Sequence, residues 1–120
     1  MDLDKVVSNS SPLINLSKID RLDLLEKLYG HIMIPNAVFE ELILKGEYSK
    51  DIEKFTPLVK NNIIEVKTVK DTNFIRALQK DLDRGESEVI ARAKEENATL
   101  LIIDEVDARR IADFHDLNKT

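Results

Sequence analysis

Short apolar runs and longer segments with helical periodicity alternate along the 120 residues of this chain. The runs are rich in β-branched residues and predict strands, whereas apolar residues at spacings of three and four predict amphipathic helices. The predicted strands cover residues 5–8, 31–34, 63–66 and 100–103. The predicted helices cover residues 11–16, 20–29, 36–45, 74–82, 86–96 and 106–115. This alternation is typical of a layered α/β protein with a mostly parallel sheet.

The least regular part of the chain is the segment 47–81, which Pro57 is expected to break. Glycines mark several helix boundaries elsewhere. Gly30 and Gly46 end two predicted helices, and Gly85 precedes another. Because no repeat, low-complexity tract or flexible linker divides the sequence, we expect residues 1–120 to form a single domain.

Composition narrows the classes of function. The 23 acidic and 18 basic residues give a net charge of -5, so a phosphate-bearing partner would need metal ions or another protein to help it bind. The absence of cysteine excludes disulfides, thiolate zinc sites and a cysteine nucleophile, and it fits a cytoplasmic location. We expect neither a signal peptide nor a membrane span, because the apolar runs are too short.

Polar side chains gather where the predicted strands end. A Ser-Asn-Ser-Ser run at residues 8–11 follows the first strand, and open α/β sheets keep their sites at such ends. Three carboxylates, Glu41, Glu86 and Asp104, lie downstream at junctions or in first turns of predicted helices. Asn9 offers only an amide where a carboxylate would bind metal more strongly. Its structural alternative is a turn or a hydrogen bond across the sheet.

Glu86 is the acid on which helical geometry says most. In a helix it shares a face with Val89 and Ile90, whereas Glu88 points the opposite way, so Glu86 is expected to face inward. Burying a carboxylate costs several kcal/mol unless it is paired or bound to metal. The alternative is a favourable interaction of a first-turn acid with the helix dipole.

The sequence pattern does not decide the roles of the other acidic residues. Asp104 follows the buried strand, where it serves either as a site residue or as a cap of the next helix. Glu105 and Asp107 either assist it or face water. The predicted helix 36–45 is apolar almost all round, which leaves two acids at its flanks, and spacing does not choose between them. They are Glu40 and Glu41.

Read in order, four motifs resemble the PIN domain, specifically the prokaryotic branch that begins S-N-x-S-P-L-I. The motifs are Ser8–Ile14, Ile34–Leu42, Arg84–Ala91 and Leu101–Glu105. Their order and spacing agree across nearly the whole chain. The resemblance implies a three-layer α/β/α fold whose mostly parallel central sheet carries a cluster of acids at the carboxyl ends of its strands.

The resemblance also implies roles for individual residues. Asn9 occupies the place of the family's first catalytic aspartate. The acids that match the family's catalytic and metal-binding positions are Glu41, Glu86 and Asp104. Additional candidate ligands are Ser11, Glu105 and Asp107.

PIN domains are typically Mg²⁺- or Mn²⁺-dependent ribonucleases, and many prokaryotic members are toxins that a small antitoxin neutralises. The resemblance therefore implies a metal-dependent endoribonuclease that binds RNA, an antitoxin protein and a second copy of itself. Closely spaced carboxylates raise one another's pKa until a divalent cation neutralises them. Magnesium keeps several waters, one of which can become the attacking hydroxide. Basic residues such as Arg84, Arg109 and Arg110 would help to recruit RNA.

Two features support a different function. Asn9 cannot ionise, and the chain ends at Thr120, where PIN domains continue, so the fold is expected to lack the C-terminal strand and helix. The alternative is a catalytically weak or inactive module that acts by binding protein or RNA. A phosphorylated receiver-type switch is a third class with similar layers, but it needs an acid pair after the first strand, which Asn9 and its serine neighbours do not supply.

Overall fold

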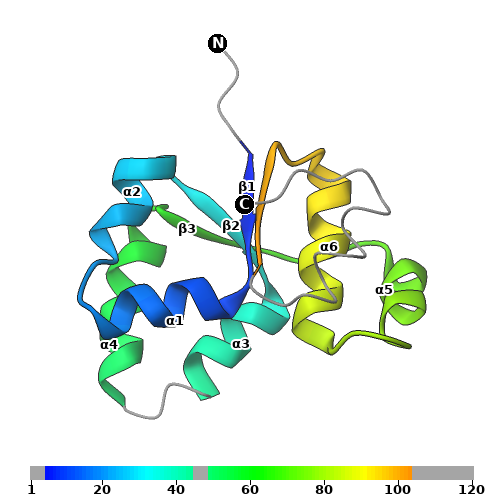
Figure 1. Ribbon diagram of the computed structural model, residues 1–120, viewed down its shortest axis with the longest axis horizontal. Helices are drawn as coiled ribbons and strands as arrows, with labels where there is room; N and C mark the ends of the chain where they lie inside the picture. Colours follow the sequence, from blue (N-terminus) through cyan, green and yellow to red (C-terminus); the bar gives the residue numbers. More distant parts are fainter. Residues whose placement is uncertain (1–4, 45–48, 104–120) are drawn as a thin grey trace.

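Strands and helices alternate along the chain in the computed structural model, which describes residues 5–44 and 49–103 (Figure 1). The first half contains β1 (Val6–Ser8), α1 (Ser10–Lys18), α2 (Asp23–Tyr29), β2 (Ile32–Pro35) and α3 (Asn36–Leu44). The second half contains α4 (Ser49–Lys60), β3 (Ile64–Lys67), α5 (Thr72–Leu78), α6 (Arg84–Glu96) and β4 (Leu100–Ile102).

Within the described residues the strands form a four-stranded sheet in the order β3-β2-β1-β4, and each neighbouring pair is parallel. In the central strand, Val7 pairs with Met33 on one side and with Leu101 on the other. All described strands therefore end at the same edge of the sheet. The prediction of an α/β fold with a parallel sheet is confirmed.

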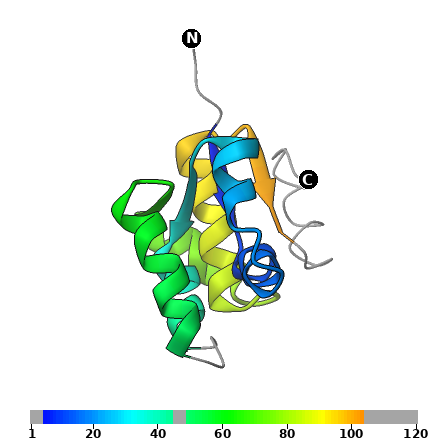
Figure 2. The same cartoon turned by 90° about the vertical axis from the view of Figure 1, so that its left-hand side faces the viewer.

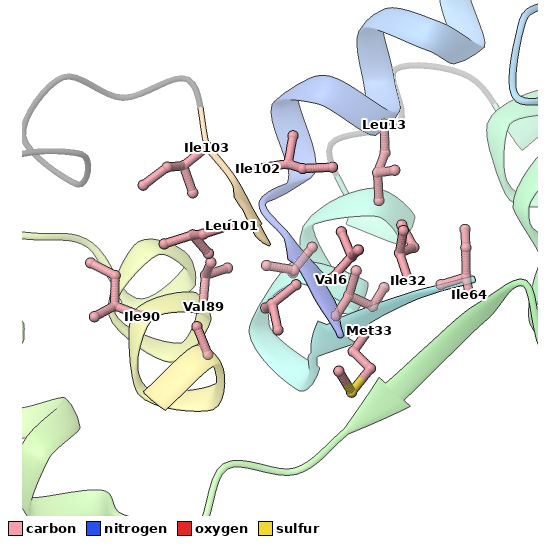
Figure 3. Close-up of a cluster of buried hydrophobic side chains, with 14 of the residues drawn as sticks. Val6, Leu13, Ile32, Met33, Ile64, Val89, Ile90, Leu101, Ile102 and Ile103 are labelled. Atoms are coloured by element: carbon pink, nitrogen blue, oxygen red, sulfur yellow. The ribbon is translucent and has the colours of Figure 1, made fainter. Parts of the chain in front are cut away.

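Helices cover both faces of this sheet (Figures 1 and 2). Figure 3 shows Leu101 and Ile103 on the side of α6, whereas Ile102 points toward Leu13 of α1. Helix α6 packs on β1 and β2, and α5 packs on α6. Each fully buried Leu or Ile stabilises the fold by about 1.5–3 kcal/mol. Side chains of the run 100–103 thus pack against helices on both faces of the sheet. The predicted three-layer arrangement is confirmed.

Local backbone chemistry explains where the first two helices begin. Asn9 caps α1, since its Oδ1 accepts a hydrogen bond from the Ser10 N–H, and the helix starts one residue earlier than predicted. Helix α2 starts at Asp23 and not at the predicted Asp20, because Asp20 adopts a left-handed conformation with φ 53°. Gly30, with φ 78°, ends α2 as predicted.

The prediction that Pro57 breaks the middle segment is wrong. Pro57 lies inside α4, which continues to Lys60. A proline in a helix costs about 3 kcal/mol. Here the helix buries Phe55 and packs Leu58 and Val59 against the core, and this burial offsets the cost.

Two later helices also begin earlier than predicted, because aspartates cap them. Asp71 accepts a hydrogen bond from the Phe74 N–H at the start of α5, and Asp83 caps α6, so Gly85 lies within that helix. The helix predicted at 106–115 and the expected lack of a C-terminal strand and helix fall outside the described residues. No helix in the described part of the chain is long and apolar enough to cross a membrane.

Candidate functional site

The candidate site lies at the carboxyl edge of the sheet, where the first turns of α1 and α6 and the second turn of α3 meet (Figure 1). β1 leads directly into α1, and β2 leads directly into α3. This topology places Asn9, Glu41 and Glu86 in one region of the molecule. Asp104, Glu105 and Asp107 lie outside the described residues, so their predicted roles stay predictions.

Asn9 joins the end of β1 to β4. Its N–H donates to the Ile102 carbonyl at 2.8 Å, and its Oδ1 accepts from the Ser10 N–H at 2.8 Å. The residue is only 4% exposed. The bond to β4 is thus made by the backbone of Asn9, and its side-chain oxygen caps the start of α1.

Glu41 is the acid of α3 that faces the site. Its Oε2 accepts a hydrogen bond of 2.7 Å from the Ser10 hydroxyl, and its Oε1 lies against Gly85 of α6. Glu40, in contrast, forms an ion pair of 2.8 Å with Arg84. The two acids that spacing did not separate therefore have different partners, and the role of Glu41 as a site residue stays a prediction.

The hydroxyl that touches Glu41 belongs to Ser10, whereas the resemblance singled out Ser11. Ser10 is buried in the first turn of α1, and Ser11 is half-buried beside it. Because α1 begins one residue earlier than predicted, Ser10 occupies the position beside the cap. Asn9, a residue type favoured at helix caps, was the available signal for the earlier helix start, whereas the contact of Ser10 with Glu41, 31 positions away, has no local signal.

Gly85 brings the first turn of α6 close to Glu41. A Cβ at Gly85 would overlap Oε1 of Glu41, so the absence of a side chain makes room for the carboxylate. Glu86 follows directly, half-buried, and its N–H donates to Asp83 Oδ1 at 2.8 Å. The structure therefore brings Glu41 next to the turn that carries Glu86, and the start of a helix favours negative charge.

The interpretation that Glu88 points away from the core is wrong. Glu88 is 8% exposed, with Oε1 accepting from the Ala37 N–H at 3.1 Å and Oε2 from Arg84 Nε at 2.9 Å. Helical periodicity failed because α6 contacts β1, β2, α3 and α5 and is buried nearly all round from 87 to 93. The i,i+4 spacing of Arg84 and Glu88 was the available signal.

Arg84 links α6 to α3. Its Nε donates to Glu88, and its Nη1 donates to Glu40 at 2.8 Å. The hydrogen bond to Glu88 is the main reason that the pKa of the Arg84 guanidinium is raised above its ordinary value. Arg84 therefore stays charged, and it compensates the carboxylate of Glu88.

The donors at this edge fit a hard divalent cation. Glu41 and Glu86 offer carboxylate oxygens, and Mg²⁺ commonly binds one or two carboxylates while it keeps several waters. Gly85 leaves the space that the Glu41 carboxylate fills. Within residues 5–44 and 49–103, however, no three His, Cys, Asp or Glu residues form a group that could hold a metal ion.

A parallel three-layer α/β domain with carboxylates beyond its strand ends belongs to the class of proteins that keep their sites at this edge. The family model described as PIN domain matches residues 5–120. The chain therefore belongs to the PIN-domain family. A search of curated proteins finds no match. Family membership points to nuclease activity in general, to divalent metal ions as usual cofactors and to RNA binding.

Proposed function

We propose that this PIN domain is a metal-dependent endoribonuclease and the toxin of a toxin–antitoxin pair. One observation carries the enzymatic part of the proposal. The Glu41 carboxylate is held by the Ser10 hydroxyl and packed against Gly85, the residue that precedes Glu86, at the carboxyl edge of the sheet. This arrangement holds an acid in place without burying its charge in the core.

Each residue at the edge has a separate task in this proposal. Ser10 orients Glu41 through a charge-assisted hydrogen bond, which is stronger than a neutral one. Glu41 and Glu86 would hold Mg²⁺ or Mn²⁺, and the metal-binding set would be completed by Asp104. When bound, such an ion supplies an activated water and polarises the scissile phosphate. Ser11, Glu105 and Asp107 are additional candidate ligands.

The net charge of -5 means that RNA must be attracted locally. Arg84 has a side chain that is 55% exposed, and it precedes Gly85 directly, so it places positive charge beside the acids. We propose that it contacts an RNA phosphate while Glu40 and Glu88 hold its guanidinium in place. Arg109 and Arg110 would add to this attraction.

The toxin assignment is supported by the Ser8–Ile14 motif of the prokaryotic branch. Its proposed partners are RNA, a small antitoxin protein and a second copy of the chain, and its proposed location is the cytoplasm. A neighbouring gene for a short antitoxin is the genetic feature that this assignment expects.

One observation favours the alternative, a catalytically weak or inactive module that binds protein or RNA. Asn9 stands at the position of the family's first acid, and its Oδ1 accepts from the Ser10 N–H. An amide brings no negative charge, so the site would hold a cation more weakly.

Cleavage of a mixed RNA pool by the purified full chain, with and without Mn²⁺, tests the proposal. The wild type is expected to cleave only with the metal. Glu86→Gln is expected to lose about 10²-fold or more in rate, because it removes a charge that the reaction needs. Glu95→Gln is the matched control on the same helix, since Glu95 binds the backbone at Lys70 and Asp71.

Two results would count against the ribonuclease. If the wild type cleaves no RNA at high protein concentration, the binding module becomes the better description of the chain. Cleavage that survives in Glu86→Gln would point to a contaminating nuclease.

A further inference from the structure

Glu88 is a buried carboxylate whose only task in the proposed chemistry is to hold Arg84, which uses one of its two oxygens. Its two oxygens are engaged, one by the Ala37 N–H and the other by Arg84 Nε. It does not cap its own helix, because Asp83 performs that task for α6. Glu88 instead satisfies an N–H in the first turn of α3, a helix 51 residues away in the chain.

The position of this contact relates it to the site. Ala37 and Glu41 are four residues apart on α3, and Gly85 and Glu88 are three apart on α6. Residues at these spacings share a helix face. The contact of Ala37 with Glu88 and that of Glu41 with Gly85 therefore lie one turn apart on the same two facing helix surfaces. Together they fix the separation and the rotation of α3 relative to α6.

Arg84 holds Glu88 in place for this contact. It bonds Glu88 from one turn earlier on α6 at 2.9 Å, and its other nitrogen reaches Glu40 on α3 at 2.8 Å. Since Glu88 is nearly buried, its bonds exchange with water less readily than those of a surface pair. We call the contacts of Ala37, Arg84 and Glu88 the brace.

We propose that Glu88 is a positioning residue, which through the brace keeps the carboxylate of Glu41 against Gly85 and beside Glu86. This inference rests on the proposed function, because the benefit of the brace is a fixed pair of metal-binding acids. Glu88 itself does not bind the ion. A shift of about 1 Å between catalytic groups can cost about 10²-fold in rate, so a rigid contact one turn from Glu41 matters to the site.

The test is the affinity of the full chain for Mn²⁺, read from the electron paramagnetic resonance signal of the free ion. Glu88→Met removes both bonds of Glu88 at similar volume, and we expect it to weaken binding about 10- to 100-fold. Glu88→Gln keeps an oxygen for the Ala37 N–H, and we expect it to recover most of the affinity. Glu95→Met is the control, because it removes a carboxylate from α6 that also accepts backbone N–H groups.

The outcomes separate this inference from the proposed function. A wild type that binds no Mn²⁺ overturns both. If Glu88→Met binds Mn²⁺ as the wild type does, or if Glu95→Met loses as much affinity, only the positioning role is overturned. Thermal unfolding of the same samples shows whether each variant is folded at the temperature of the titration.

The wild-type chain carries a second test, which holds even if Glu88→Met does not fold. Coupling between two sites is reciprocal, so an ion that the brace helps to bind must in turn stabilise the brace. Saturation with Mg²⁺ is therefore expected to slow hydrogen exchange of the Ala37 amide. An unchanged exchange rate at saturation would contradict the inference.

Discussion

At Gly85 the absence of a side chain decides the geometry of the site. The carboxylate of Glu41 occupies the space in which a Cβ would lie, and the Ser10 hydroxyl donates to its other oxygen. Glu41 is thus placed by one missing side chain and one hydroxyl. Asn9, which precedes Ser10 in the chain, contributes hydrogen bonds to this edge but no charge.

The substitution Gly85→Ala is expected to raise the stability of α6 and to lower RNA cleavage. Alanine is favoured over glycine in a helix by about 0.5–1 kcal/mol, which would stabilise α6. The new methyl group must displace the end of Glu41, so we expect RNA cleavage to fall by about 10²-fold while the fold is retained. Urea unfolding and RNA cleavage on the same sample measure the two effects. Unchanged cleavage would contradict the packing of Glu41 against Gly85.

Ser10→Ala tests which serine orients the acid. Loss of a hydrogen bond to a charged group is expected to lower the free energy of unfolding by about 1.5–3 kcal/mol and to slow cleavage. Ser11→Ala is the matched variant one residue further along α1, and we expect it to stay within about 0.5 kcal/mol of the wild type. The result to watch for is the reverse order, which would restore the role that the resemblance assigned to Ser11.

Among the elements, helices α3 and α6 both contribute contacts to the candidate site. The α3 helix presents Glu41 to α1 and Glu40 to Arg84, so adjacent acids serve different contacts. The first turn of α6 leaves room for Glu41 at Gly85. In its second turn, Glu88 accepts a hydrogen bond from the Ala37 N–H of α3. Helix α4 lies against β3 and α3, where it supports the fold without supplying a residue to the site.

Pro57→Ala tests the explanation for α4. Alanine restores the N–H that a helix bonds to the carbonyl four residues earlier, and Pro57 lies on an exposed part of the helix. We expect the free energy of unfolding to rise by up to about 3 kcal/mol, with RNA cleavage unchanged. The measurement is urea denaturation. A fall in stability would mean that the ring of Pro57 makes a packing contribution that its exposure does not indicate.

For the molecule as a whole, the sequence pattern predicted the sheet well, because a buried strand requires a run of apolar residues that are neighbours in the sequence. The apolar runs around Val7, Met33 and Leu101 are β-branched or aliphatic and became neighbouring strands. Chain order and strand ends then placed the candidate site at one edge. The same edge carries Asn9, Glu41 and the first turn of α6 in the structure.

The contacts that shape the site could not be predicted, because they join residues far apart in the chain. Glu41 meets Ser10 across 31 positions, and Arg84 meets Glu40 across 44. Helical periodicity assumes one face toward water, whereas α6 is enclosed, so Glu88 was assigned to the wrong side. Helix α1 begins at Ser10, one residue earlier than the pattern predicts.

Calorimetric titration of Mn²⁺ into the full chain tests most directly whether Glu41 belongs to a metal site at the sheet edge. The wild type is expected to bind saturably, and Glu41→Gln is expected to bind at least about 10-fold more weakly, while Glu95→Gln binds as the wild type does. Equal affinity in Glu41→Gln, or no binding by the wild type, would contradict the assignment of this edge as a divalent metal site.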